Sequence, residues 1–131
     1  MTHRISPTNM GPQRPAPVRL HVLSDPHLEL LDGHESVAPR TDADVVILAG
    51  DIHHGVRGLT WARKQFPEQE VIYIAGNHEY YGQVWAALLP QFRRKAKELG
   101  IHFLDNDAVE LAGVRFLGTT LWTDFDLHGI D

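Results

Sequence analysis

The chain has 131 residues, a net charge of −5 and a pI near 5.9, and 43% of its residues are hydrophobic. This length suits one domain with its own core, and the acidic balance argues against nucleic acid or an anionic membrane as the main partner. The sequence has no cysteine, which excludes disulfides, thiolate catalysis and cysteine-ligated zinc or iron–sulfur clusters. It also has no apolar run of membrane-spanning length and no hydrophobic signal core, so we expect a cytoplasmic protein.

A proline-rich leader and three strands are predicted first. Residues 1–17 hold four of the eight prolines and little that could be buried, which indicates a flexible segment outside the fold. Three apolar runs, each ended by polar or turn-forming residues, then predict strands. They lie at 18–23, 45–49 and 71–75. The run at 45–49 is continuously apolar, as expected of a strand that is buried on both faces.

Helices and short strands make up the remainder of the predicted elements. One helix is expected at 59–66 and an amphipathic one at 84–99. Pro90 lies inside the second pattern and predicts either a kink or two helices that meet there. Short strands follow at 101–104, 108–111 and 114–117. A hairpin turn is expected at Gly113. Strands that alternate with helices and then pair antiparallel predict an α/β domain with a mixed sheet.

Side chains able to bind metal follow the three long strands at a constant interval. Asp25, Asp51 and Asn77 are 26 residues apart (51−25 and 77−51). Ligands of open α/β sheets bind beyond the carboxyl ends of the strands, so these side chains should meet at one edge. Asp25 and His27 would leave an extended segment on the same face. A carboxylate and a neutral imidazole suit a borderline divalent metal such as manganese, iron or zinc.

The other positions suggest how such a site would be completed. Asp51 follows an apolar strand, where an unpaired carboxylate is costly, and a bridge between two cations would explain it. Asn77 offers an amide oxygen to a second metal, and two metals roughly 3.5–4 Å apart can activate water and neutralise a phosphoryl oxygen. His78 is a candidate general acid or electrostatic stabiliser. Glu79 is expected to orient His78, and His53 is expected to support the site or to be solvated.

Each of these positions also has an ordinary structural interpretation. A single Asp or Asn after a strand is more often a turn or helix cap than a ligand, and a single histidine there is usually solvated. The prediction of a metal site therefore depends on the combination of residues at matching strand ends.

The segments Asp25-x-His27, Gly50-Asp51 and Gly76-Asn77-His78-Glu79 resemble the calcineurin-like metallophosphoesterase family in order and spacing. The resemblance runs from about residue 18 to residue 121. It implies a four-layer αββα sandwich of two mixed sheets, with a dinuclear centre that hydrolyses phosphomonoesters or phosphodiesters by metal-activated hydroxide. It also implies roles for single residues. Asp25 and His27 would hold the first metal, Asp51 would bridge, Asn77 would hold the second metal, and His78 would be the catalytic histidine.

Three further histidines complete the family site, two of them in a Gly-His-x-His motif, and this sequence does not contain that motif before Asp131. We therefore expect residues 18–131 to form the N-terminal portion of the sandwich, as a C-terminally truncated domain. The first functional hypothesis is an enzyme acting on a phosphoester substrate. The alternatives are a truncated, catalytically weak or inactive metal-binding fragment, and a binding module with structural acids. A sheet left uncovered in such a fragment predicts self-association.

Overall fold

The computed structural model describes residues 17–31, 37–124, 126 and 129. Four strands form one parallel sheet in the order β1-β2-β3-β4, and two strands form a separate antiparallel sheet. The strands are β1 (Leu20–Leu23), β2 (Val45–Ala49), β3 (Glu70–Ile74), β4 (His102–Phe103), β5 (Asp107–Leu111) and β6 (Val114–Gly118). The helices are α1 (Arg57–Gln65) and α2 (Trp85–Leu99), with two short 3-10 helices, η1 (Leu28–Leu30) and η2 (His78–Tyr80). The predicted α/β class is confirmed, with parallel and antiparallel pairs divided between two sheets. The predicted leader, apart from residue 17, lies outside the described residues.

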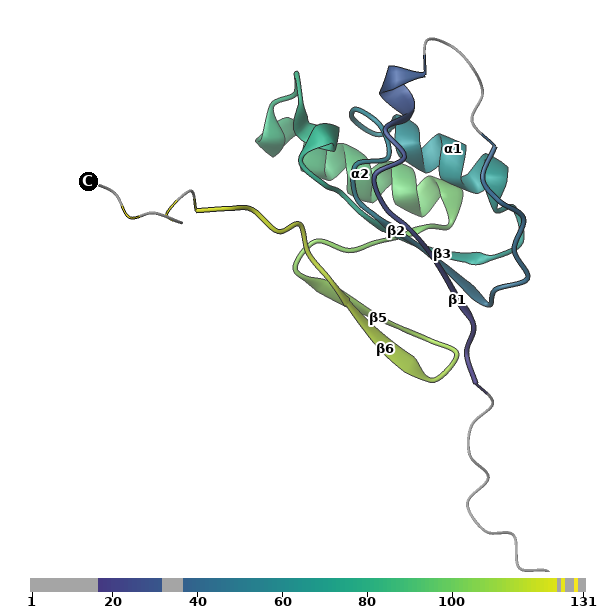
Figure 1. Cartoon of the computed structure of the whole chain (residues 1–131). Helices are drawn as coiled ribbons and strands as arrows, with labels where there is room; N and C mark the ends of the chain where they lie inside the picture. Colours follow the sequence, from purple (N-terminus) through teal and green to yellow (C-terminus); the bar gives the residue numbers. More distant parts are fainter. Residues whose placement is uncertain (1–16, 32–36, 125, 127–128, 130–131) are drawn as a thin grey trace, which may run out of the picture.

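The sheet is covered on both faces at β2, whose successive residues point to opposite sides. Val46 and Leu48 pack in the core cluster that also holds the buried residues of α1 and α2. Val45 and Ile47 pack in a second cluster with apolar residues of the β5–β6 hairpin. Figure 1 shows the two helices and the hairpin on opposite sides of the sheet. The observed layers are therefore helices, parallel sheet and hairpin, and this double burial explains the continuous apolar run of β2.

The second predicted helix is one element and not two. α2 continues through Pro90, which lies in its second turn, so the two-helix alternative is wrong. Leu88 and Phe92 face the core, whereas Trp85 at the start of the helix is 53% exposed. Gly100 ends the helix with φ 62°, a left-handed conformation that favours glycine. In the part of the chain that the structure describes, neither α-helix has the length and apolar character to cross a membrane.

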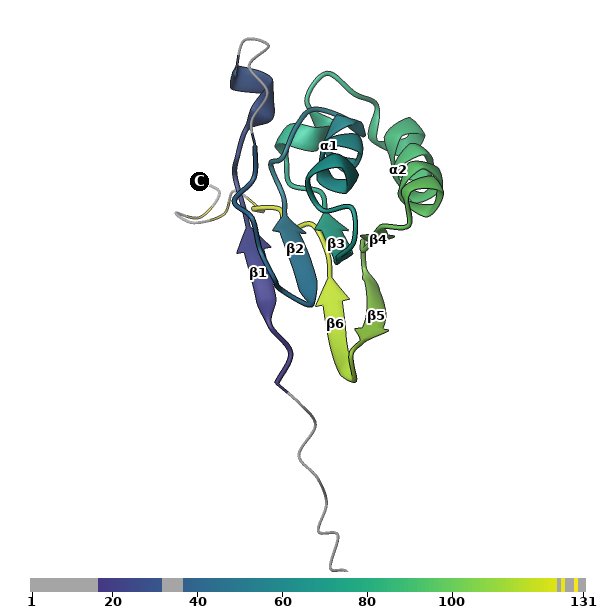
Figure 2. The same cartoon turned by 90° about the vertical axis from the view of Figure 1, so that its right-hand side faces the viewer.

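The register of the parallel strands explains the constant spacing of the candidate ligands. Leu20 pairs with Val45, and Val45 pairs with Glu70, so paired residues differ by 25 in number (45−20 and 70−45). An interval of 26 therefore moves each successive ligand one residue farther along its strand. Figure 2 shows the arrowheads of β1, β2 and β3 at the same end of the sheet. That end is where the polar residues after each strand gather.

The edge strand β1 carries exposed apolar side chains. Leu20 and Val22 are 47% and 59% exposed. Exposed apolar groups on an edge strand are the kind of surface through which self-association would occur, and that association stays a prediction.

Candidate metal centre

The loops after β1 and β2 are joined by backbone hydrogen bonds that extend the pairing of the two strands. These bonds run from Asp25 N–H to Gly50 O at 3.1 Å, from His27 N–H to Asp51 O at 3.1 Å, and from Leu28 N–H to Ile52 O at 3.0 Å. Because the backbones are fixed to each other in this way, the side chains of the two loops are held against the same edge of the sheet.

Three of the four predicted metal ligands have a strained backbone conformation. Asp25, His27 and Asp51 have φ angles of 56°, 43° and 56°. Among the non-glycine residues that the structure describes, Asn106 and Ala112 are the other two with positive φ, and both lie in connections between strands. Such conformations cost on the order of 1–3 kcal/mol each and are typical of functional sites, where the surrounding structure holds them in place.

Two glycines let the loops after β2 and β3 approach closely. A Cβ atom on Gly50 would lie 2.9 Å from the Cα atom of Gly76. A Cβ atom on Gly76 would lie 2.7 Å from the backbone nitrogen of Asp51 and would also collide with its carboxylate. The glycine before Asp51 and the glycine before Asn77 are therefore required by this close approach, and Gly50 also by its φ of 93°.

Asp25, His27 and Asp51 come within reach of a single cation. One ligand atom from each residue lies within 4.8 Å of the others. His27 Nε2 is 3.8 Å from Asp25 Oδ1, and Ser24 Oγ donates to the other oxygen of Asp25. Two carboxylates and an imidazole are a donor set that fits a borderline divalent metal. The three residues predicted at the ends of β1 and β2 are thus brought together.

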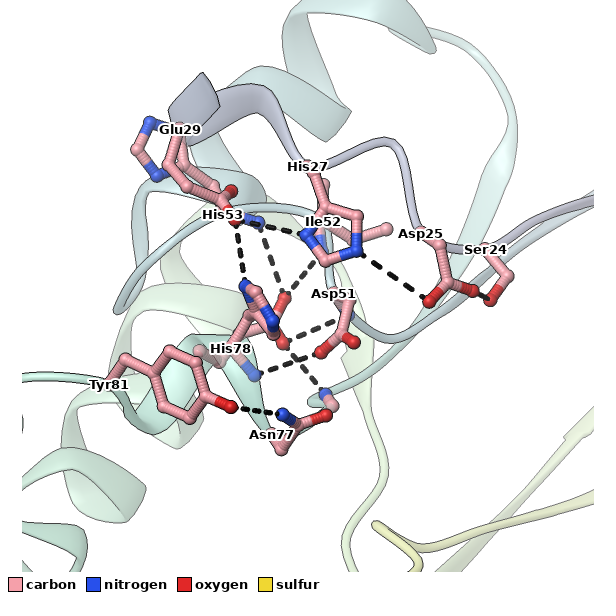
Figure 3. A network of polar contacts seen from close by, with 12 residues as sticks. Ser24, Asp25, His27, Glu29, Asp51, Ile52, His53, Asn77, His78 and Tyr81 are labelled. Carbon is pink, nitrogen blue, oxygen red and sulfur yellow. Dashed lines mark hydrogen bonds and ion pairs between the residues drawn. The ribbon is translucent and has the colours of Figure 1, made fainter. Parts of the chain in front are cut away.

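Asn77 and His78 enter this edge from the loop after β3. The backbone N–H of His78 donates to Asp51 Oδ1 at 2.9 Å, which ties η2 to the loop after β2. Asn77 Nδ2 donates to the hydroxyl oxygen of Tyr81 at 2.8 Å, and the centroids of the Tyr81 and His78 rings are 4.5 Å apart. Figure 3 shows these side chains around Asp51.

Glu79 is fully buried, and its carboxylate anchors the loops instead of contacting an imidazole ring. It accepts hydrogen bonds from Gly76 N at 2.7 Å, Ile52 N at 2.8 Å, Asp51 N at 3.0 Å and the Tyr73 hydroxyl at 2.8 Å. Burial, followed by the charge of Glu79, raises the pKa of Tyr73 well above its ordinary value. These partners differ from the expected partner, the ring of His78.

His53 lies next to the loop that Glu79 anchors. Its backbone N–H is 3.4 Å from Glu79 Oε1, and its ring centroid is 6.2 Å from that of His54. Burial lowers the pKa of His53, which favours the neutral imidazole.

Glu29 is the residue that the sequence prediction missed. Its side chain is 5% exposed, and Oε1 lies 2.9 Å from His78 Nδ1 and 3.0 Å from His27 Nδ1. The two imidazole rings meet edge to face, with centroids 4.3 Å apart. The available signal was the alternation Asp25-x-His27-x-Glu29.

The charges in this cluster shift its pKa values. Burial favours the neutral Glu29 carboxyl, but hydrogen bonds from the backbone, His27 and His78 outweigh burial and lower the pKa of Glu29 to about 2. The hydrogen bond to Glu29 raises the pKa of His27, against a smaller opposing effect of desolvation. Glu29 is therefore an anion that acts directly on two of the predicted site residues.

Comparison with known proteins agrees with this geometry. A family model described as calcineurin-like phosphoesterase matches residues 18–130, a range that contains every strand, both helices and all the candidate ligands. No curated protein sequence matches the chain. Because the matched range covers most of the 131 residues, the chain belongs to the calcineurin-like phosphoesterase family.

Proposed function

We propose that this protein is a metal-dependent phosphoesterase that hydrolyses phosphomonoesters or phosphodiesters at the carboxyl edge of its parallel sheet. The observation that carries the proposal is the convergence of Asp25, His27 and Asp51 within 4.8 Å of one another, in a member of a phosphoesterase family. The positive φ angles of the same three residues support a functional origin for the cluster.

In the proposed site, Asp25 and His27 hold one divalent ion, Asp51 is shared between two ions, and Asn77 binds the second. Manganese, iron and zinc fit this mixture of oxygen and nitrogen donors. When bound, such ions polarise phosphoryl oxygens and lower the pKa of water. Glu79 holds the loops in place through their backbone N–H groups, which keeps Asp51 beside η2.

His78 is the proposed proton-transfer residue. Its Nδ1 atom is occupied by Glu29, so Nε2 is the atom left to exchange a proton with the leaving oxygen of the substrate. The rings of Tyr81 and His54 lie 4.5 and 6.4 Å from the His78 ring. They would give the leaving group an aromatic surface beside the proton donor.

Hydrolysis of p-nitrophenyl phosphate and bis(p-nitrophenyl) phosphate by the purified chain with Mn²⁺ tests the proposal. We expect turnover of at least one substrate and its loss to background in Asp51→Ala. Asp107→Ala is the matched control because it removes an exposed carboxylate on the hairpin, and it should retain activity. Equal hydrolysis by the Asp51→Ala variant and the wild type would contradict the proposal.

A mononuclear metal-binding domain with weak or no turnover is the second candidate. The observation that favours it is that the three converging residues could hold one ion without Asn77. Counting bound metal distinguishes the two candidates. Two ions per chain support the dinuclear site, whereas one ion per chain without hydrolysis supports the metal-binding domain.

A further inference from the structure

Glu29 is a buried carboxylate to which the metal chemistry above assigns no task. It lies in η1, two residues after His27, and its side chain is 5% exposed. Placing a carboxylate away from water is costly unless it is paired and hydrogen-bonded. Both contacts that Oε1 makes with other side chains are to imidazole nitrogens, at 3.0 Å for His27 and 2.9 Å for His78. One oxygen atom is therefore shared by two rings of the candidate site.

These contacts decide which nitrogen of each neutral ring carries the proton. An ionised carboxylate only accepts hydrogen bonds, so the ring atom that faces it must be an N–H donor. Nδ1 is then protonated in both rings, and Nε2 keeps its lone pair. For His27, Nε2 is the atom on the Asp25 side, 3.8 Å from Oδ1. The opposite tautomer would direct an N–H group toward Asp25, where the proposed cation would bind.

The backbone fixes Glu29 in this place between the rings. The N–H of His27 donates to Asp51 O, and the N–H of Leu28 donates to Ile52 O, so η1 is attached to the loop after β2. His78, which begins η2, is attached to Asp51 through its own N–H. Figure 3 shows dashed contacts from Glu29 to both rings. Segments that follow β1 and β3 thus meet at one carboxylate, and the loop after β2 is bonded to both of them.

We propose that Glu29 is a shared positioning residue, which holds His27 and His78 in the tautomer with the proton on Nδ1. Nε2 of His27 is thereby available to a metal, and Nε2 of His78 is available to the substrate. The task given to His78 rests on the proposed phosphoesterase function, whereas the tautomers are a property of the metal-free chain. One carboxylate consequently sets metal affinity and proton transfer together.

Nitrogen-15 NMR of the 131-residue, metal-free chain at alkaline pH reads the tautomers directly. We expect Nδ1 to be protonated and Nε2 to be unprotonated in both rings, with assignments from His27→Asn and His78→Asn. Glu29→Gln should move at least one ring toward the other tautomer, because its amide has one accepting oxygen and a donating NH₂ group. A proton on Nε2 of either ring in the wild type, or unchanged tautomers in folded Glu29→Gln, would overturn the proposal.

Metal titration provides a second readout. Zn²⁺ should perturb Nε2 of His27 and leave its Nδ1 protonated, and Glu29→Gln should weaken Zn²⁺ binding by about 10–100-fold, as is typical for carboxylates behind a ligating histidine. Binding of Zn²⁺ through Nδ1 of both rings would make Glu29 a ligand and would overturn the positioning role. In an active preparation, the same variant should lower kcat with little change in KM.

Glu70→Gln is the matched control. It removes another glutamate–histidine contact, Glu70 Oε2 to His102 Nε2 at 2.9 Å, which lies at the opposite end of β3. It should leave the tautomers, Zn²⁺ affinity and kcat unchanged, and equal effects of the two variants would refute a specific role for Glu29. If no preparation hydrolyses phosphoesters, the proposed function fails, while the tautomers and Zn²⁺ affinity still decide the role of Glu29. If Glu29→Gln does not fold, the wild-type tautomers decide it alone.

Discussion

Two buried glutamates at the same edge of the sheet have different kinds of partner. Glu79, in η2, accepts hydrogen bonds from backbone N–H groups and from Tyr73, and we call this region the base of the site. Glu29, in η1, contacts the rings of His27 and His78, and we call this region the rim. Backbone amides neither titrate nor bind metal, whereas imidazoles do both. The comparison shows that burial alone does not separate a structural carboxylate from a chemical one, and that the partners do.

Removal of the Glu79 carboxylate at the base of the site should have the largest effect on stability. Glu79→Ala leaves four backbone N–H groups and the Tyr73 hydroxyl without their acceptor in a buried place. We expect the free energy of unfolding to fall by about 3–5 kcal/mol, measured by urea denaturation. Tyr73→Phe removes one of the same bonds and should cost about 1 kcal/mol. A Glu79→Ala variant as stable as Tyr73→Phe would break the distinction between base and rim.

Two glycine substitutions distinguish an effect on the geometry of the site from an effect on the stability of the fold. Gly76→Ala places a methyl group against the carboxylate of Asp51, and Gly118→Ala places one 2.6 Å from the Cβ atom of Leu104, in the second core cluster. Both should lose about 1–3 kcal/mol of stability through overpacking. Only Gly76→Ala should also weaken Zn²⁺ binding, by about tenfold or more, because it displaces Asp51, a proposed ligand. Equal Zn²⁺ affinities in calorimetric titration would show that the close approach at Gly76 serves the fold alone.

The rim should respond to pH. The pKa of Glu29 is lowered from 4.5 to about 2, so its ionised form adds stability that is present above pH 4.5 and is lost as the pH falls toward about 2. The stability advantage of the wild type over Glu29→Gln should therefore shrink by about 1–3 kcal/mol across that window, as measured by urea denaturation at each pH. The pKa of His27 is raised, and its contribution has the opposite sign. It is present below pH 6.5 and is lost as the pH rises through the raised value.

A constant advantage of the wild type between pH 5 and pH 2 would show that the Glu29 charge is not coupled to folding. Glu79→Gln offers a comparison within the same edge of the sheet. The partners of Glu79 are backbone amides and the Tyr73 hydroxyl, which keep their protons throughout this range. Any stability that the Glu79→Gln variant loses at acid pH therefore cannot come from imidazole partners.

The sequence predicts where the candidate ligands gather, but it does not predict the contacts of the rim. The edge that collects Asp25, Asp51 and Asn77 follows from local apolar runs and from a strand register that repeats with the same offset. The contact between Glu29 and His78 depends on a left-handed turn at His27, a conformation that few non-glycine residues adopt.

Sequence adjacency was also misleading for Glu79. It follows His78 directly, and orientation of that ring was the natural expectation. In the short helix η2, however, the Glu79 carboxylate lies against the backbone of the loop after β2, while the His78 ring contacts Glu29. The identity of each acid's partner was therefore beyond the sequence, because it is set by how three loops pack at one edge.

Loss of the exposed hydrogen bond between Asn77 and Tyr81 should have the smallest effect on metal binding. Tyr81 is 51% exposed, and its hydroxyl accepts a hydrogen bond from Asn77 Nδ2 at 2.8 Å. Tyr81→Phe should leave unfolding unchanged and weaken binding of the proposed second ion by about two- to fivefold, because an exposed hydrogen bond contributes at most about 1 kcal/mol to holding the amide oxygen in place. Asn77→Ala should abolish binding of that ion in the same Zn²⁺ titration. If both variants bound as many ions as the wild type, Asn77 would not be a ligand and the site would hold its metal through Asp25, His27 and Asp51 alone.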